Sequence, residues 1–420
     1  MTLGSSDLVV PFRGERYRAA ERLSALIAPP YDVIPPPERA RLAALDEHNI
    51  VHVLLPEAPS GWPGADRYAW AAERLAAWRQ DGVLARDPEP AAYVMAQDFA
   101  LPTGERRTRL GVFGALAAEG YESRRVRPHE KTHAGPKADR LALLRATATN
   151  VESIFLIAPD PGGALEATLG AVAARKPDAT AQLDGVGIRL WVVTDADAPR
   201  LLAPVSRLPV YIADGHHRYE TASAHAREHP AADRVLAFIA SARDPGLVVL
   251  PTHRLIFGAG RDPDQLLDFW RRFFDVGRLA PCADRMERLA QLGASGTACL
   301  VALPGGRDLS LVLRKDAPLD DVPGLSKSQA LRSLDIAVVE ELVVKELLRL
   351  DTSTPTLTYT ADARAAFEAV RRGAAASAVL LNGTKVPQVF AVADAGEFMP
   401  PKSTYFVPKV PSGLVLRPVA

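Results

Sequence analysis

The chain has 420 residues, 48% of them hydrophobic, and its 50 basic and 50 acidic residues leave no formal net charge at pH 7. This length and apolar content predict a globular protein with two domains or one large, elaborated domain. A balanced charge provides no overall field toward nucleic acid or an anionic membrane, so we expect neither as a partner. Any anion site must then be local.

The N-terminal sequence MTLGSSDLVVPFRGERY has no basic stretch followed by an apolar run, and no segment approaches 18 uninterrupted apolar residues. We therefore expect a cytoplasmic protein without a membrane span. The two cysteines, Cys282 and Cys299, are too few for a disulfide framework or a metal knuckle. We expect both to be buried apolar side chains.

The first half of the chain alternates helical and strand patterns. Prolines at 35–37 lead into a helix predicted over 38–46, and the spacing in RYAWAAERLAAWRQDGVL predicts an amphipathic helix closed at Gly82. AAYVMAQDFAL and TRLGVFGALAA, joined by PTGE, predict a β-hairpin, and a helix is expected over 137–149. ESIFLIAPD, IRLWVVTDA and PVYIADG are short apolar runs between turn residues, as core strands are.

The second half continues the mixture. RVLAFIASARDPGLVVLPTHRLIF predicts two strands around a DPG turn, followed by a helix over 263–276. TACLVALPGGRDLSLVLRK predicts a second hairpin, 334–350 and 362–372 predict helices, and ASAVLLNG predicts a strand. We expect an α/β fold with a mixed (α+β) sheet. Residues 1–260 would form its body, and 265–420 a C-terminal α/β portion, either separate or packed with that body.

The stretch PVYIADGHHRYETASAHA, residues 209–226, places polar side chains between a predicted strand and a predicted helix. The free amides and positive dipole end of a helix N-terminus form an anion site. Gly215 lets the backbone approach a ligand closely, and Arg218 supplies a two-pronged donor. The pattern predicts a phosphate site formed by Asp214, Gly215, His216 and Arg218.

The paired histidines do not by themselves predict a transition-metal site. Consecutive side chains point about 100° apart on a helix, so His216 and His217 would not share one ion. Asp214 is a candidate ligand for magnesium, which prefers carboxylate and phosphate oxygen. A purely structural alternative also exists, in which Asp214 caps the helix and Arg218 pairs with Glu220 or another acid.

A second candidate segment, RPHEKTHAGPKADRLALLRATATN, begins at residue 127. It concentrates charged side chains before a helix, and a carboxylate beside a lysine in a partly closed site can act as a general base. We therefore expect catalytic roles for Glu130, Lys131 and Asp139. The alternative is a solvated charged face.

Lysine is scarce here, at 9 of the 50 basic residues, so its positions draw attention. Four lysines lie in two short stretches, the one just described and MPPKSTYFVPK. They are Lys131, Lys137, Lys402 and Lys409. Because a compact ammonium suits a phosphate, we expect Lys137 and Lys402 to bind phosphate or nucleotide.

Six motifs occur in order over nearly the whole chain: PFRGERY, APPYDVI, HEKTHAGPKADRLALLRATATN, YIADGHHRYETA, LPTHRLI and MPPKSTYFVPKVPSGLV. Together they resemble the DUF1015 family of uncharacterised proteins. ADGHHRYETA also resembles the strand, DG turn, His-x-Arg and helix signature of the ParB/sulfiredoxin-like superfamily. That resemblance implies a core of this type with large elaborations.

The members of that superfamily differ in what they imply. Sulfiredoxins carry a reactive cysteine where this chain has His216, and ParB partition proteins bring a helix-turn-helix and a basic surface that are not evident here. Free-serine kinases use the DGHxR turn for nucleotide phosphate and an acid from another segment as base. The resemblance therefore implies phosphoryl transfer.

The resulting hypothesis is phosphoryl transfer from a nucleotide, ATP or ADP, to a small hydroxylated metabolite, with magnesium at Asp214. Amides of residues 215–218 would hold the phosphates, and Glu130 would take the acceptor's proton, with His217 as the alternative base. Residues 127–140 should then fold against the DGHHR turn. A phosphohydrolase of a small phosphomonoester and a non-catalytic nucleotide- or phosphate-binding regulator are the competing hypotheses.

Overall fold

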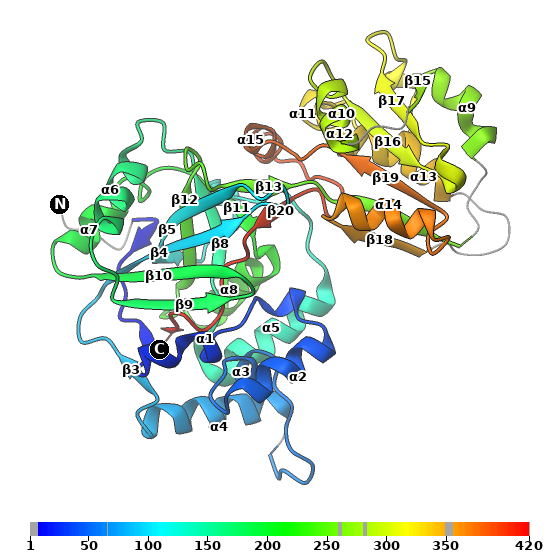
Figure 1. Ribbon diagram of the computed structural model, residues 1–420. Coiled ribbons are helices and arrows are strands. Elements are labelled where there is room, and N and C mark those ends of the chain that lie inside the picture. Colours follow the sequence, from blue (N-terminus) through cyan, green and yellow to red (C-terminus); the bar gives the residue numbers. More distant parts are fainter. Residues whose placement is uncertain (1–6, 65, 259–262, 280–283, 349–355, 420) are drawn as a thin grey trace. The chain divides into compact units, whose positions relative to one another are not determined.

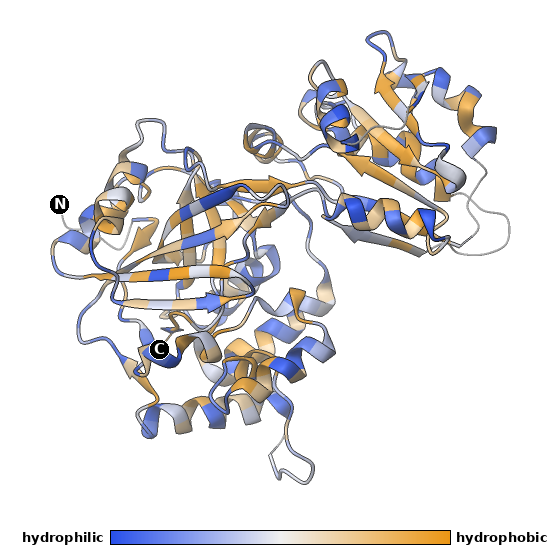
Figure 2. Cartoon of the chain, viewed as in Figure 1, coloured by the Kyte–Doolittle hydropathy of each residue, from blue (hydrophilic) through white to orange (hydrophobic). Residues whose placement is uncertain are grey.

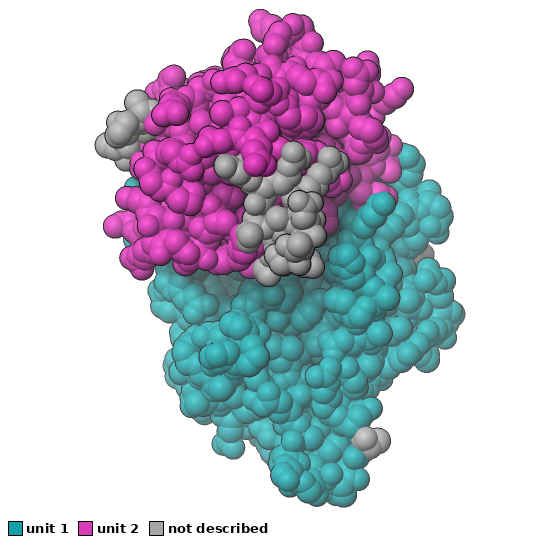
Figure 3. Space-filling view, turned by 90° about the vertical axis from the view of Figure 1, so that its right-hand side faces the viewer, with its two compact units in different colours: residues 1–248, 408–420 teal, residues 249–407 magenta. Residues whose placement is uncertain are grey.

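The computed structural model describes residues 7–64, 66–258, 263–279, 284–348 and 356–419. The chain forms two compact units, one of residues 1–248 with 408–420 and the other of residues 249–407 (Figure 3). The second unit is thus inserted into the first in sequence, and the last residues of the chain belong to the first unit. The division into a body over residues 1–260 and a C-terminal portion over residues 265–420 stays a prediction.

The first unit is built on a nine-stranded sheet of order β6-β11-β8-β12-β5-β4-β10-β9, with β1 paired to β5 (Figure 1). Strands β6 and β11 are parallel, as are β8 and β12, while the other printed pairs of this sheet are antiparallel. The expected α/β fold with a mixed sheet is confirmed. The strands are β1 Val9–Val10, β4 Ala92–Ala100, β5 Arg106–Ala117, β6 Val126–Arg127, β8 Ile154–Ala158, β9 Ala179–Leu183, β10 Val186–Val193, β11 Val210–Asp214 and β12 Arg234–Ser241.

The centre of this sheet holds the most apolar strands. Every residue of β8 and β12 is buried, as expected for strands covered on both faces. The predicted hairpin is confirmed, since β4 and β5 pair antiparallel with Tyr93 opposite Phe113. Strand β8 of this centre pairs with β11, whose end carries the functional candidates.

Helices pack around the sheet of the first unit. Helix α5 contacts both α4 and α8, and Figure 1 shows α2, α3, α4 and α5 gathered together. The side chain of Asp66 caps α4 by accepting from the amides of Tyr68 and Ala69. The helices are α1 Leu23–Leu26, α2 Pro36–Leu45, α3 Val51–Leu54, α4 Arg67–Gln80, α5 Ala134–Thr147, α6 Ala164–Ala173, α7 Asp197–Leu202 and α8 His216–Glu228.

The second unit has a six-stranded sheet of order β15-β17-β16-β19-β14-β18. All of its printed pairs are antiparallel, and the predicted hairpin is β16 with β17. In Figure 2, β16 and β19 are hydrophobic while α14 alternates, as a helix with one buried face does. The strands are β14 His253–Phe257, β15 Phe274–Arg278, β16 Ala298–Ala302, β17 Leu309–Leu313, β18 Thr356–Thr360 and β19 Ser377–Leu381. The longer helices are α9 Pro263–Arg271, α10 Arg285–Leu292, α14 Ala363–Arg371 and α15 Val386–Asp394.

The helix predicted over 263–276 is wrong at its end. It stops at Arg271, and residues from Phe274 onward form β15, because they pair with β17 and this ladder outweighs the helical spacing. The helix predicted over 334–350 is interrupted by a π-helical turn at Glu340–Val344 and is described as far as Leu348.

The two strands predicted around the DPG turn fall into different units. Strand β12 pairs in the first sheet and β14 in the second, while a short strand between them, β13 Val248–Leu250, pairs with β20 Tyr405–Val407. Cys299 is buried as expected, and Cys282 lies outside the described residues. Within the described part of the chain, no helix has the length and apolar character needed to cross a bilayer.

Candidate functional site

The DGHHR turn forms as predicted. Strand β11 ends at Asp214, α8 begins at His216, and Gly215 between them has φ 92°, in the left-handed region. A Cβ at this position would lie 3.0 Å from Nε of Arg218 and 3.1 Å from a methyl carbon of Ile154. Glycine is therefore required both by the backbone and by the close approach of Arg218.

Asp214 is held by two cations. Its Oδ1 accepts from Nζ of Lys409 at 2.6 Å and its Oδ2 from Nη2 of Arg218 at 2.5 Å. Burial alone would raise the pKa of Asp214, but Lys409 and Arg218 together bring that pKa well below its usual range. The carboxylate therefore stays ionised. We call Asp214, Gly215, Arg218 and Lys409 the cradle.

Arg218 is the most enclosed cation of the cradle, with 9% of its side chain exposed. Burial lowers its pKa, but Glu152, Asp214 and Asp32 outweigh that effect and raise the pKa overall. One nitrogen also donates to the carbonyl of Ser153. Its Nε is buried and has no hydrogen-bond partner among the described residues.

Lys409 reaches the cradle from the C-terminal segment. Gln97 donates from Nε2 to the carbonyl of Lys409 at 2.9 Å, and Arg109 donates from Nη2 to the carbonyl of Pro408 at 2.6 Å. Arg109 is fully buried, with its guanidinium 4.5 Å from the ring centre of Phe155. The scarcity of lysine drew attention to Lys409, but the sequence predicted no role for it in the site. The reason is that 195 residues separate Lys409 from Asp214.

The segment 127–140 folds against the turn, as expected. The amide of His129 donates to Nε2 of His216 at 3.3 Å, and the amide of His133 donates to Nε2 of His217 at 2.8 Å. Burial lowers the pKa of His216 well below its ordinary value and also lowers that of His217. Both imidazoles are therefore neutral acceptors at Nε2, so that atom of His217 is occupied.

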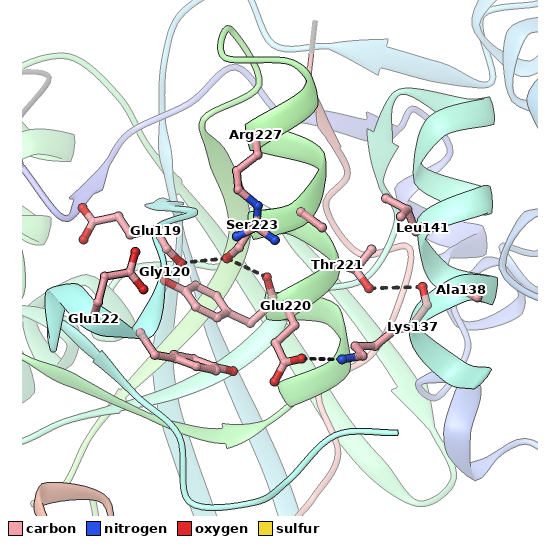
Figure 4. Close-up of a pocket in the computed structure, with 13 residues that line it drawn as sticks. Glu119, Gly120, Glu122, Lys137, Ala138, Leu141, Glu220, Thr221, Ser223 and Arg227 are labelled. Atoms are coloured by element: carbon pink, nitrogen blue, oxygen red, sulfur yellow. Dashed lines mark hydrogen bonds and ion pairs between the residues drawn. The ribbon is translucent and has the colours of Figure 1, made fainter. Parts of the chain in front are cut away.

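Glu220 ties α8 to the same segment. Its carboxylate accepts from Oγ1 of Thr132 at 2.7 Å and from Nζ of Lys137 at 2.9 Å. Figure 4 shows the pair with Lys137. Lys137 thus lies on Glu220, about one helical turn beyond the cradle. The structural alternative for the turn holds in one of its two parts: Asp214 makes no side-chain cap on α8, whereas Arg218 does pair with an acid, Asp214.

Asp139 points away from these groups. It accepts from Nη2 of Arg67 at 2.6 Å, from the hydroxyl of Tyr68 at 2.7 Å and from Nη2 of its neighbour Arg140 at 2.6 Å. Positions 137 and 139 differ by two residues and so point about 200° apart on a helix. Lys137 therefore faces α8 while Asp139 faces α4.

The remaining predicted residues have different settings. Glu130 is half-buried and Lys131 exposed, between His129 and Thr132, whose contacts to α8 place this backbone at the edge of the turn. Lys402 belongs to the second unit, where its carbonyl accepts from Nη1 of Arg254 at 3.3 Å.

Two acids near the cradle went unrecognised in the sequence. Glu152 is buried and accepts from the amide of Tyr31 at 2.9 Å, which anchors the turn Tyr31–Val33. Asp32 in that turn is exposed, and its charge acts on both His217 and Arg218. The sequence feature that could have indicated Asp32 is its place as the acid of the proline-containing motif APPYDVI.

Asp214 was the expected ligand for magnesium, and its surroundings bear on that role. Both carboxylate oxygens of Asp214 already accept from cations, and no group of three or more His, Cys, Asp or Glu residues that could hold a metal occurs in the described ranges. Asp214 does not fit the role of a magnesium ligand. Its geometry instead fits a residue that orders Arg218 and Lys409 for an anion.

Comparisons with known proteins add the following. A search of curated proteins finds no match. Similar solved structures include a conserved hypothetical protein from Pyrococcus furiosus, with 15% identity, TM-score 0.35 and coverage of 72% of this chain and 93% of that one. Free serine kinase in complex with AMP has 14% identity, TM-score 0.36 and coverage of 71% and 87%. SbnI with a C-terminal truncation, from Staphylococcus aureus, has 10% identity, TM-score 0.38 and coverage of 73% and 87%.

These TM-scores lie below 0.5, so any inference about function has to rest on the chemistry of the site. The family comparison is stronger. A model described as "Protein of unknown function (DUF1015)" matches residues 9–337. That range is most of the chain and includes the DGHHR turn and the segment folded against it. The protein therefore belongs to the DUF1015 family.

Proposed function

We propose that this protein binds a nucleotide by its phosphates at the N-terminus of α8 and transfers a phosphoryl group to a small hydroxylated metabolite. One observation carries the proposal: Arg218 and Lys409 converge on Asp214 beside a glycine turn that opens a 13-residue helix. The first amides of that helix have no intrahelical partner and point in the same direction as its dipole. This combination is suited to phosphate oxygens.

The charges of the cradle support an anion. Within the cradle, Asp214 offsets one of the two positive charges of Arg218 and Lys409, and the helix dipole adds to the charge that remains, while Glu152 and Asp32 outside the cradle place negative charge near Arg218. The lowered pKa of Asp214 keeps this balance down to acidic pH. Because Arg218 is enclosed, its attraction for a phosphate is screened less than that of a surface arginine.

Transfer also needs a group that takes the acceptor's proton. The acceptor hydroxyl oxygen forms a bond to the terminal phosphorus as the bond to the nucleotide breaks, and its proton passes to a carboxylate. We propose Glu130 for this role, and Asp32 as the competing candidate because it is exposed and acts electrostatically on His217 and Arg218. Asp139 is engaged with Arg67 and Tyr68 of α4, so it does not compete for this role.

Phosphorus NMR tests the proposal directly. The protein is incubated with ATP or ADP, with and without magnesium, and with pools of hydroxylated metabolites. We expect a new phosphomonoester signal that grows as the terminal phosphate of the nucleotide is lost, and we expect Arg218→Ala to suppress it.

The other outcomes identify the competing functions. Release of inorganic phosphate from added phosphomonoesters, without a nucleotide, would establish a phosphohydrolase. A nucleotide that raises the melting temperature but is never consumed would establish a binding regulator. If no nucleotide or phosphorylated compound binds, the cradle is not a phosphate site and the proposal fails.

A further inference from the structure

The function proposed above assigns no role to Tyr31, the first residue of the turn Tyr31–Val33. The turn follows two prolines, and the second, Pro30, has φ −64° and ψ 152°. Because proline fixes φ, the chain enters the turn in a restricted conformation. The side chain of Tyr31 is partly exposed, and no described residue is hydrogen-bonded to its hydroxyl.

Buried groups hold the rest of Tyr31 in place. Its ring lies under the guanidinium of Arg140, 4.3 Å from the ring centre, and 5% of the Arg140 side chain is exposed. Arg140 also donates from Nη1 to the carbonyl of Leu54 at 3.0 Å. The amide of Tyr31 donates to Oε1 of Glu152 at 2.9 Å. Ring and backbone are both anchored, so the hydroxyl can bind a ligand with little loss of conformational freedom.

The same buried groups reach the cradle. Glu152, which holds the amide of Tyr31, precedes Ser153, whose carbonyl accepts from Arg218. Arg140, Glu152 and Arg218 also line one small cavity of about 40 Å³. Tyr31 and Arg218 are therefore anchored on consecutive residues of the chain.

A backbone pairing brings Tyr31 toward Lys409 as well. Ala28 and Ser412 form an antiparallel bridge, in which the amide of Ala28 donates at 3.2 Å and that of Ser412 at 2.8 Å. In such a pair, the residues after one partner lie beside the residues before the other. Tyr31 comes three residues after Ala28, and Lys409 comes three residues before Ser412. Both segments thus leave the bridge in the same direction, and each spans at most about 10 Å.

The charges around the hydroxyl agree with this placement. Burial raises the pKa of Tyr31 to about 12, although Arg218 and Arg140 both act to lower it. Of the two arginines, Arg218 has the larger effect, even though Arg140 lies directly over the ring. The hydroxyl is therefore within electrostatic range of Arg218, and at neutral pH it keeps its proton and can donate it to a hydrogen bond.

We propose that the hydroxyl of Tyr31 donates a hydrogen bond to a phosphate oxygen of the ligand that Arg218 and Lys409 hold. The inference rests on the proposed function and adds a neutral donor to the two cations of the cradle. A phosphate oxygen carries negative charge, so this hydrogen bond is stronger than one between neutral groups. The phosphates then receive donors from three segments that are far apart in the sequence.

A variant that lacks only the hydroxyl tests this role. Calorimetric titration measures the affinity of ADP and of tripolyphosphate, which contains phosphate groups alone. We expect Tyr31→Phe to weaken both ligands at least tenfold, the scale of a hydrogen bond to a charged group. Tyr68→Phe is the matched control, because it removes a hydroxyl that donates to Asp139, and both affinities should stay within twofold.

Amide exchange separates a lost hydrogen bond from a disturbed turn. The amide of residue 31 should exchange at the same rate in the wild-type protein and in Tyr31→Phe, because the phenylalanine backbone can still donate to Glu152. Faster exchange in Tyr31→Phe would assign the weaker binding to the backbone and overturn the inference.

The possible failures are distinct. If Arg218→Ala weakens ADP and tripolyphosphate but Tyr31→Phe does not, only this inference fails. If Tyr31→Phe lowers turnover while both affinities stay unchanged, the hydroxyl serves the acceptor and the inference is again overturned. If neither ADP nor tripolyphosphate binds the wild-type protein, the proposed function itself fails.

Discussion

The chain places a histidine directly before an arginine in each of its two units, His217–Arg218 in the first and His253–Arg254 in the second. The backbone separates their roles. On the first turn of α8, His217 meets His133 and Arg218 meets Asp214. On strand β14, successive side chains point to opposite faces, and both residues are buried in the unit.

The partners of the two arginines differ in kind. Nitrogens of Arg254 donate to the carbonyls of Thr252, Pro401 and Lys402, and its Nε lies 3.4 Å from Glu340. His253 accepts from the amide of Leu381, as expected of a core histidine. The nitrogens of Arg254 donate to groups of its own unit, whereas Nε of Arg218 has no hydrogen-bond partner among the described residues.

The largest expected effect concerns turnover at the Arg218 site. Either Glu130→Gln or Asp32→Asn should lower kcat by about 10²- to 10⁴-fold, the contribution of a general base, while nucleotide affinity stays within about twofold. Asp139→Asn is the matched control and should retain turnover, because Asp139 faces α4. Steady-state kinetics with the acceptor found by NMR measures all three. Full activity in both Glu130→Gln and Asp32→Asn would remove the carboxylate base from the mechanism.

The second effect concerns stability in the other unit. Arg254→Ala removes a buried donor from three carbonyls and from the half-buried carboxylate of Glu340, so it should destabilise the second unit by about 3–5 kcal/mol. Hydrogen exchange of the β14 amides measures this loss locally. Nucleotide affinity should not change. A variant that keeps its stability and loses nucleotide binding would contradict the distinction between the two arginines.

The third effect is on ligand affinity at the cradle. Arg218→Ala should weaken nucleotide binding by about 1.5–3 kcal/mol, the scale of hydrogen bonds to a charged group. Its cost in stability should be smaller than that of Arg254→Ala, because Asp214 keeps its ion pair with Lys409. Calorimetric titration provides the affinity and urea unfolding the stability. Unchanged affinity would show that the phosphates bind elsewhere.

The smallest effect is the pH dependence of stability. Burial lowers the pKa of His129 in the first unit and of His253 in the second to about 4. Their ordinary value is about 6.5, so between these limits the unfolded chain binds protons that the folded protein does not. Stability should therefore be complete above about pH 6.5 and fall toward pH 4. The slope for each histidine is at most about 1.4 kcal/mol per pH unit.

Substitutions assign this slope to each unit. His129→Gln and His253→Gln should each remove one histidine's share of the loss of stability between pH 7 and pH 5. Hydrogen exchange of the amides in β11 and β14 measures this loss in each unit. A pH dependence unaffected by both substitutions would mean that these histidines do not titrate differently in the two states.

The local sequence predicted Asp214, Gly215 and Arg218 of the cradle. It also predicted that residues 127–140 fold against the turn, because the two segments carry complementary chemical groups. The local sequence did not predict the direction in which individual side chains point. Lys137 and Asp139 share a charged loop and helix start, yet they face α8 and α4 respectively, because two residues along a helix turn a side chain to the opposite side. Only knowledge of which helices flank α5 separates them.

The sequence by itself determined the strand, the glycine turn and the helix of the DGHHR motif. These depend on apolar spacing, on the positive φ of Gly215 and on free amides, which are all properties of a few consecutive residues. Tertiary structure alone decided that Lys409 completes the cradle and that Asp32 lies near it. The order of the strands and the buried contacts of Arg109 and Gln97 bring Lys409 to Asp214, and the hydrogen bond from Tyr31 to Glu152 anchors the turn that carries Asp32. No local pattern encodes either pairing.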